Sequence, residues 1–195
     1  MVHLKSVTEI ERIRTSCRIA AEAMLAVSEE LKPGVTTDHL DQVADRYIRS
    51  QNAVASALGY RGFPRSICIS VNDEVVHGIP GERVLQKGDI LAVDIAVKKN
   101  GYHGDMNVSM KAGDVTTQAQ SLLDTTRQSL ENGIAACSPG QRLGDIGHAI
   151  QSYVEERGFS IVREYCGHGI GECFHCAPNI PHYAGNKAKF VMKPG

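Results

Sequence analysis

Apolar residues at helical spacing dominate the first fifty positions of the chain. From Thr8 to about Leu31 they recur every three or four residues, at Ile10, Ile13, Cys17, Ala20, Ala21, Met24 and Val27. Thr8 can cap the start of a helix, and Lys32-Pro33-Gly34 ends it. After Thr37 a second set of apolar residues shares one helical face: Leu40, Val43, Ala44, Tyr47 and Ile48. We therefore predict two amphipathic helices in this region.

Alternation of apolar and polar residues replaces the helical period between about residues 66 and 110. Residues 66–71, SICISV, alternate as a strand does, and VNDEVVHGIP (71–80) reads as a polar, turn-rich strand end. Two longer arms follow, GDILAVDIAV and YHGDMNVSM, which are joined at Asn100-Gly101. An Asn-Gly pair between two such runs is a strong signal for a tight turn, so we predict a β-hairpin here.

The second half of the chain follows the plan of the first. Helices are predicted from Thr117 to about Ala136 and from about Leu143 to Arg157, with Ser138-Pro139-Gly140 between them. A strand, FSIVREY (159–165), is predicted to lead into the glycine-rich segment CGHGIGECFHCAP. The alternation of helices and strands predicts an α/β (α+β) fold.

An internal repeat supports this division into two halves. At a constant offset of 106, Pro33-Gly34 matches Pro139-Gly140, and the matching apolar pairs are Leu40 with Ile146, Ala44 with Ile150, Tyr47 with Tyr153, and Ile48 with Val154. The second-half equivalent of the hairpin would begin near Gly195, and aligning Gly88 with Gly195 places the counterpart of Asp94 six residues past it. We therefore predict two related halves, of which the second is incomplete.

Two carboxylates interrupt the predicted hairpin. Asp94 stands inside an apolar, β-branched run, and Asp105 follows the turn. If Asn100-Gly101 form a two-residue turn, the two acids lie diagonally on one face, and a shift of one residue puts them directly opposite. Like charges facing each other cost roughly 0.2–1 kcal/mol even when exposed, and more when buried. A divalent cation between the carboxylates would offset that repulsion, because such ions prefer oxygen ligands.

Composition narrows the function class. The chain has 195 residues, 42% of them hydrophobic and 22% charged, and a formal net charge of −1 without a basic run. We expect no specific nucleic-acid partner from this balance, and no apolar run approaches the roughly 20 residues of a membrane helix. The amino terminus is charged and amphipathic, so we expect no secretory signal and a cytoplasmic location. The six cysteines are then expected to be free thiols or ligands.

The glycine-flanked His168 and the Phe-His pair after it connect these features to a known family. CGHGIG followed by FH, with DIAV…GYHGD and VNDEVVHGIP upstream, resembles the type I methionine aminopeptidases. The resemblance runs from about residue 5 to the last residue, and the three motifs occur in the family's order. It implies one domain over residues 1–195 with its C-terminal part missing. It also implies the "pita-bread" fold, in which two pseudo-symmetric halves surround a dinuclear metal centre.

The resemblance assigns a role to nine residues by their place in these motifs. The implied metal ligands are Asp94, Asp105 and His168. The implied catalytic residues, which contact the substrate and stabilise the transition state, are His77 and His175. The implied lining of the methionine side-chain pocket is Tyr60, Phe63, Cys68 and Phe174. Two further ligands of the family are glutamates of the second half, and both would lie beyond Gly195.

The implied reaction is removal of the initiator methionine from nascent proteins by a metal-activated water. The implied cofactors are divalent metal ions, two per complete site. Co, Mn, Fe and Zn all remain candidates, because nitrogen and oxygen ligands do not discriminate among these metals. The implied partners are the N-terminal methionine of nascent peptides and the ribosome. His103, two residues before Asp105 on the same strand face, is predicted to be a neighbour of the site.

Three alternatives compete with this interpretation. A catalytically impaired relative that binds peptides or a partner chain is favoured by the incomplete second half, and by Met106 and Cys176 where the family has Thr or Ser and Glu. A zinc site could use the ligands Cys166, His168, Cys173, His175 and Cys176, although a second C-x-x-C pair is lacking. A related creatinase-type hydrolase or proline-specific peptidase would share the fold, but would need an extra amino-terminal domain.

Overall fold

A computed structural model describes residues 2–185 and 190–195, and this part of the chain forms two compact units. The first, called the hairpin unit, contains Thr8–Thr117 and Ile170–Phe174. The second, called the C-terminal unit, contains the remaining described residues. The short segment Ile170–Phe174 therefore belongs to the hairpin unit although the chain on both sides of it belongs to the C-terminal unit.

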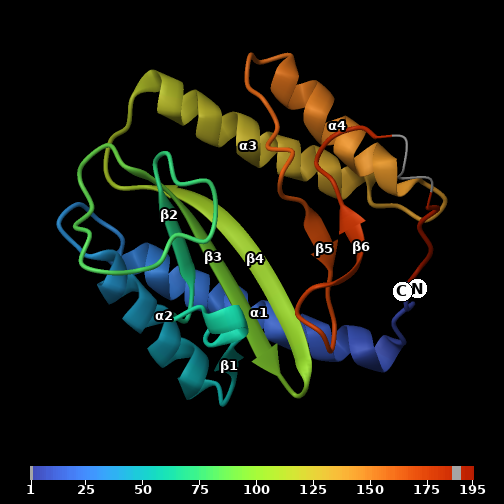
Figure 1. Cartoon of the computed structure of the whole chain (residues 1–195), viewed down its shortest axis with the longest axis horizontal. Helices are drawn as coiled ribbons and strands as arrows, with labels where there is room; N and C mark the ends of the chain where they lie inside the picture. The colour runs from blue at the N-terminus through green and yellow to red at the C-terminus, as the bar shows by residue number, and fades with distance from the viewer. Residues whose placement is uncertain (1, 186–189) are drawn as a thin grey trace. The chain divides into compact units, whose positions relative to one another are not determined.

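Two helices and an antiparallel sheet make up the hairpin unit (Figure 1). In chain order its elements are α1 (Val7–Glu30), α2 (Thr37–Ser50), β1 (Val54–Ala55), a short 3-10 helix η1 (Tyr60–Gly62), β2 (Cys68–Val71), β3 (Ile90–Lys99) and β4 (Tyr102–Lys111). β3 pairs with β4 over its whole length, and also pairs with β2 and with β1 at different places along it. The apolar run predicted as a buried strand is thus the central strand of the sheet.

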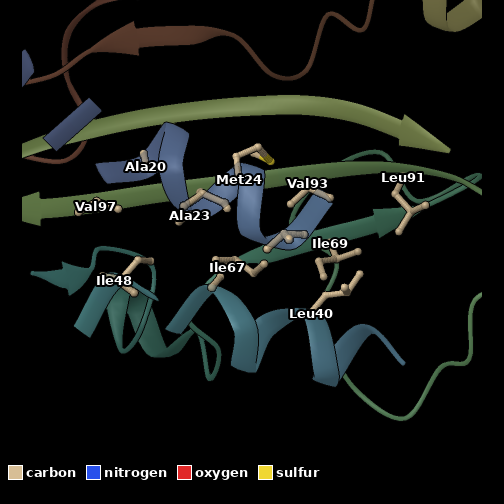
Figure 2. Packing of buried hydrophobic residues seen from close by; sticks show 14 of the residues in the cluster. Ala20, Ala23, Met24, Leu40, Ile48, Ile67, Ile69, Leu91, Val93 and Val97 are labelled. Carbon is tan, nitrogen blue, oxygen red and sulfur yellow. The ribbon is translucent and has the colours of Figure 1, made fainter. Parts of the chain in front are cut away.

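The core of the hairpin unit lies between the sheet and its two helices (Figure 2). The labelled side chains in this core are Ala20, Ala23 and Met24 of α1, Leu40 and Ile48 of α2, and Ile67, Ile69, Leu91, Val93 and Val97. Successive side chains of a strand point to opposite faces. Val93 and Ile95 of β3 point into this core, so Asp94 between them occupies the other face of the sheet.

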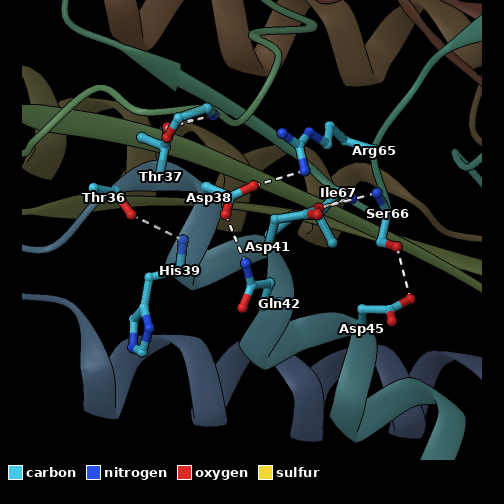
Figure 3. A network of polar contacts seen from close by, with 11 residues as sticks. Thr36, Thr37, Asp38, His39, Asp41, Gln42, Asp45, Arg65, Ser66 and Ile67 are labelled. Carbon is cyan, nitrogen blue, oxygen red and sulfur yellow. Dashed lines mark hydrogen bonds and ion pairs between the residues drawn. The ribbon is translucent and has the colours of Figure 1, made fainter.

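Polar contacts tie α2 to the start of β2 (Figure 3). Thr36 caps the helix by accepting a hydrogen bond from the backbone N–H of His39 at 3.1 Å. The buried carboxylate of Asp41 accepts hydrogen bonds from the backbone N–H groups of Ser66 and Ile67, both at 2.9 Å. Burial raises the pKa of Asp41, and these two N–H groups oppose the rise. These hydrogen bonds fix the position of the start of β2 relative to α2.

The C-terminal unit contains α3 (Thr117–Ala136), α4 (Leu143–Glu155) and an antiparallel pair of short strands, β5 (Gly167–Gly169) and β6 (Cys176–Ile180). Its core is a small cluster on α4: Leu143, Ile146, Ile150 and Val154. Phe159, Ile161, Ile180 and Met192 pack against that cluster. Among the described residues of both units, no helix is both long and apolar enough to cross a lipid bilayer.

The repeat seen in the sequence correctly identifies the buried faces of α2 and α4. Leu40, Ala44 and Ile48 are buried in the hairpin unit. Their equivalents at an offset of 106, Ile146, Ile150 and Val154, are buried in the C-terminal unit. Each helix therefore turns the same side of the repeated pattern toward its own core.

The strand predicted over residues 159–165 is wrong. This segment has no regular secondary structure, and Phe159 and Ile161 pack against the α4 cluster instead. A strand needs a neighbour to complete its hydrogen bonds, and no strand in the described part of the chain pairs with this segment. The strands of this unit lie further on, in β5 and β6, and are too short to show a clear alternating pattern.

The expectation for the cysteines is wrong at two positions. Cys173 and Cys176 are disulfide-bonded. The other four, Cys17, Cys68, Cys137 and Cys166, are free thiols as expected. The alternative zinc site therefore loses two of its five candidate ligands.

Candidate functional site

The turn at Asn100-Gly101 sets the register of the two candidate carboxylates. Lys99 pairs with Tyr102 across the turn, so the connection has two residues. Counting back along β3, Asp94 lies opposite Asn107, two residues from Asp105. The two acids are therefore diagonal neighbours on one face of the sheet, which is the first of the two arrangements predicted from the sequence.

The electrostatics of this pair are unfavourable in the absence of a cation. Burial, the charge of Asp94 and a hydrogen bond shared with its side chain together raise the pKa of Asp105 to about 7. A proton between the two carboxylates is thus retained up to neutral pH. A divalent cation could replace that proton, so the donor set and its charge fit a metal of the kind that carboxylates bind.

Cys68 lies directly opposite Asp94 on the neighbouring strand. The two residues are paired between β2 and β3, and Cys68 is buried with 8% of its surface exposed. Burial, together with the nearby charges of Asp94, Asp105 and Asp41, raises the pKa of the Cys68 thiol to about 12. A thiol with such a pKa stays neutral and is not a nucleophile. It therefore suits the role of an apolar, sulfur-bearing wall.

Aromatic side chains from distant parts of the chain gather in the hairpin unit. The ring centroids of Tyr60 and Phe174 are 5.1 Å apart in an edge-to-face arrangement. Phe63 is half-buried and ends η1, where its backbone N–H donates to the Tyr60 carbonyl at 3.0 Å. The structure thus brings Phe174 next to Tyr60, although more than a hundred residues separate them in the sequence.

His77 is held in an unusual backbone conformation. It is exposed, and its φ of 60° lies in the left-handed region that a residue with a side chain rarely adopts. Gly78 after it packs so closely on β2 that an added Cβ would overlap the Ile69 carbonyl oxygen. The Gly78 carbonyl also accepts a hydrogen bond from the Ile69 N–H at 3.0 Å. The close packing of Gly78 explains how the strained conformation at His77 is maintained.

His168 and His175 lie side by side in the C-terminal unit. Their ring centroids are 4.2 Å apart, with His168 on β5 and His175 directly before β6. The imidazole Nδ1 of His168 lies 3.0 Å from the carbonyl oxygen of Gly169. An added Cβ on Gly169 would overlap the Ala177 carbonyl oxygen. The glycine beside His168 is therefore required by the close approach of β6.

Comparison with known proteins identifies the family. Residues 11–195 match metallopeptidase family M24. The chain belongs to this family. It is 46% identical over 195 residues to methionine aminopeptidase 1 of Bacillus subtilis, a match that covers 100% of this chain and 79% of that protein. It is 45% identical to methionine aminopeptidase 1A of Arabidopsis thaliana, and the match covers 100% of this chain and 49% of the plant protein.

Solved structures agree with this assignment. The crystal structure of methionine aminopeptidase from Rickettsia prowazekii matches with a TM-score of 0.96 at 39% identity, covering 99% of this chain and 78% of that chain. The M24 chain therefore has the pita-bread fold that the sequence motifs implied. It spans about half of the plant relative's length and just under four fifths of the other two proteins.

The predicted site residues of this M24 chain fall into two groups. The hairpin unit contains His77, Tyr60, Phe63, Cys68, Phe174, Asp94 and Asp105. The C-terminal unit contains His168 and His175. Among the described residues, no group of three or more His, Cys, Asp or Glu side chains is placed to hold a metal ion. Contacts within each unit bring the two aspartates together and, separately, the two histidines.

The sequence indicated His103 only as a neighbour of the site, and the structure adds its contact with Phe174. His103 is 7% exposed, and its ring lies parallel to that of Phe174 at a centroid distance of 5.3 Å. In the sequence, His103 is marked only by its position two residues before Asp105, which places both side chains on one face of β4.

Proposed function

We propose that this M24 metallopeptidase is a metal-dependent methionine aminopeptidase, which removes the initiator methionine from nascent proteins. The observation that carries the proposal is the pair Asp94 and Asp105, whose burial and mutual repulsion raise the pKa of Asp105 to about 7. Such a pair costs stability and is explained by a task that needs it. The identities of 46% and 45% to proteins named methionine aminopeptidase support the choice of reaction.

Asp94 and Asp105 would hold the metal through their carboxylates, and His168 would add an imidazole. The chemistry that a bound divalent cation (Co, Mn, Fe or Zn, two in a complete site) supplies is a lower pKa for water and a polarised peptide carbonyl. Asp94 and Asp105 are diagonal neighbours on two hydrogen-bonded strands, so the sheet holds their carboxylates at a set spacing before any ligand arrives. The shared proton must leave when a cation binds, so we expect affinity to rise with pH through about 7.

His77 and His175 would act on the peptide itself, by donating hydrogen bonds to the scissile carbonyl as negative charge develops on its oxygen. The left-handed backbone at His77 supports this role, because strained conformations concentrate at functional positions. His175 is exposed and follows Phe174 directly, so one short segment would supply both a pocket wall and a hydrogen-bond donor.

The pocket for the methionine side chain would be formed by Tyr60, Phe63, Cys68 and Phe174. Their rings and the neutral thiol of Cys68 offer polarisable, apolar contacts that suit an unbranched thioether. We place the reaction in the cytoplasm, with newly made chains at the ribosome as its substrates, because the initiator methionine first becomes available there.

Release of free methionine from a Met-Gly-Met-Met peptide tests the proposal, with an Ala-Gly-Met-Met peptide for comparison. The purified chain is assayed with Co²⁺, Mn²⁺, Fe²⁺ or Zn²⁺ and after treatment with a chelator. We expect hydrolysis of the methionyl peptide with at least one metal, and a loss of at least about 100-fold in Asp94→Asn and Asp105→Asn. Asp114→Asn is the matched control, because Asp114 is 90% exposed and pairs with Lys87.

Metal binding is measured on the same proteins by calorimetry. Tight binding that disappears in Asp94→Asn but not in Asp114→Asn supports the proposal. A wild-type chain that binds methionyl peptides without cleaving them under any metal would contradict it, and would favour a peptide-binding relative instead.

A further inference from the structure

Contacts with Ser56 and Phe174 fix the ring of His103 within the hairpin unit. Its Nδ1 lies 2.8 Å from the hydroxyl oxygen of Ser56. Ser56 is itself held, because its backbone N–H donates to the Ala96 carbonyl on β3 at 2.8 Å. The ring of His103 lies parallel to that of Phe174, with 5° between the planes and 5.3 Å between the centroids. The hydrogen bond to Ser56 therefore fixes the plane against which Phe174 stacks.

The backbone of the same region holds the segment Ile170–Phe174. The backbone N–H of His103 donates to the Gly171 carbonyl at 2.8 Å, and Gly171 is buried. The hydroxyl of Tyr102 lies 3.1 Å from the carboxylate of Glu172. Tyr102 and His103, at the start of β4, thus contact this segment at three places. These are the Gly171 carbonyl, the Glu172 carboxylate and the ring of Phe174.

His103 also shares a strand face with Asp105. Side chains two residues apart on a strand point the same way, so the imidazole and the carboxylate project from one face of β4. The strand that presents a candidate metal ligand therefore presents, one step earlier, the support for Phe174. This arrangement sets the height and tilt of the Phe174 ring relative to the carboxylate pair.

We propose that His103 is a positioning residue for the substrate's first side chain. It holds Phe174 and the segment Ile170–Phe174 on β4, and so sets the distance between the methionine pocket and the carboxylates. The proposal rests on the proposed function, because it takes Phe174 as part of that pocket. His103 acts through Phe174 and needs no contact with the reacting atoms.

The chemistry of the side chain explains why histidine serves here. A phenylalanine could stack on Phe174 but could not bond Ser56, whereas a glutamine could bond Ser56 but could not stack. Histidine does both, so its two single-function replacements separate the contributions of the ring and of the hydrogen bond.

The variants His103→Ala, His103→Phe, His103→Gln and Ser56→Ala test the proposal. His148→Ala is the control, because His148 is exposed on α4. In peptidase assays with Met-Gly-Met-Met and a norvaline analogue one atom shorter, we expect His103→Ala to raise KM for the methionyl peptide about tenfold and to lower the preference for methionine about as much. His103→Phe should recover more of the preference than His103→Gln, and kcat should change less than KM in each.

Amide hydrogen exchange supplies a readout that needs no substrate. The N–H of residue 103 is protected by the Gly171 carbonyl, so release of the segment exposes it. We expect His103→Ala to speed exchange at position 103 and at Gly171 at least about tenfold relative to wild type and His148→Ala. Ser56→Ala is the mildest change, so its exchange rate should lie between those of His103→Ala and wild type.

Unchanged exchange in His103→Ala would overturn the inference, and so would an unchanged preference for methionine in an active enzyme. A wild-type chain without peptidase activity would count against the proposed function alone. In that case faster exchange in His103→Ala supports the holding role of His103, and equal exchange overturns it.

Discussion

The two units start from the same sequence pattern and bury it to different extents. At the repeat offset of 106, Met24 of α1 corresponds to Leu130 of α3, yet Met24 is 4% exposed and Leu130 is 54% exposed. In the hairpin unit, Leu91, Val93, Ile95 and Val97 of β3 cover the helices. In the C-terminal unit the described strands are three and five residues long.

This difference shows what the hairpin contributes. An amphipathic helix must bury its apolar face against another element, and a long strand can cover more of that face than a short one. The β3–β4 hairpin does so with one face and presents Asp94 and Asp105 on the other, so a single element links the core of the unit to its candidate site.

A charge placed at the equivalent positions of α1 and α3, Met24 and Leu130, should give the largest difference in stability between the units. Met24→Glu puts a carboxylate into the closed core of the hairpin unit, and we expect a loss of at least about 4 kcal/mol in the free energy of unfolding, or failure to fold. Leu130→Glu lies on an exposed surface and should change it by about 0.5 kcal/mol or less. Urea denaturation of both variants measures the difference, and equal losses would show that α3 is buried as deeply as α1.

Truncation at the equivalent buried positions of α2 and α4 should give a smaller contrast. Leu40 is completely buried, and Leu40→Ala should cost about 3–4 kcal/mol because the surrounding core cannot collapse around the cavity. Ile146 is 7% exposed in a smaller cluster, and Ile146→Ala should cost about 2 kcal/mol. Thermal unfolding followed by circular dichroism compares the two. A larger loss for Ile146→Ala would contradict the ranking of the two cores.

Changes to the carboxylates of the hairpin should have the smallest effect on the free energy of unfolding, and that effect should depend on pH. The folded pKa of Asp105 is raised from 3.8 to about 7, so the folded state keeps a proton that the unfolded state has lost between these values. The free energy of unfolding of the metal-free chain should therefore fall as pH rises from about 4 to about 7. Asp94→Asn removes the neighbouring charge, so it should be more stable than wild type by about 1–2 kcal/mol at pH 8 and by less at pH 5.

Melting temperatures in chelator at pH 5 and pH 8 measure this effect, with Asp114→Asn as the control. Addition of a divalent cation should reverse the order, since wild type then gains more stability than Asp94→Asn. A wild-type chain that is stabilised by raising the pH without metal would contradict the account of the carboxylate pair.

Most of the fold could be predicted because its signals are local. The Asn100-Gly101 turn predicted that β3 pairs with β4 but left two registers open, and the structure has the two-residue turn. The apolar spacing predicted the helices to within a residue or two. The failure at residues 159–165 has a physical cause. Its β-branched residues satisfy the propensity for a strand, but pairing depends on a neighbour elsewhere in the chain.

The sequence motifs selected the candidate site residues, whose roles stay predictions, but they did not specify the contacts of those residues. The motifs selected the two aspartates and the two histidines, and each pair is in contact within its own unit. The stacking of His103 on Phe174 had no local signal, because the two residues are 71 positions apart in the sequence.

The sequence was sufficient for the four long helices, the β3–β4 hairpin and the faces that α2 and α4 turn inward. These follow from side-chain periodicity and from the few dihedral angles that a two-residue turn allows. The tertiary structure alone decided that Ile170–Phe174 joins the hairpin unit and that residues 159–165 form no strand. Both outcomes depend on which distant backbone groups are available to bond, and local sequence does not specify them.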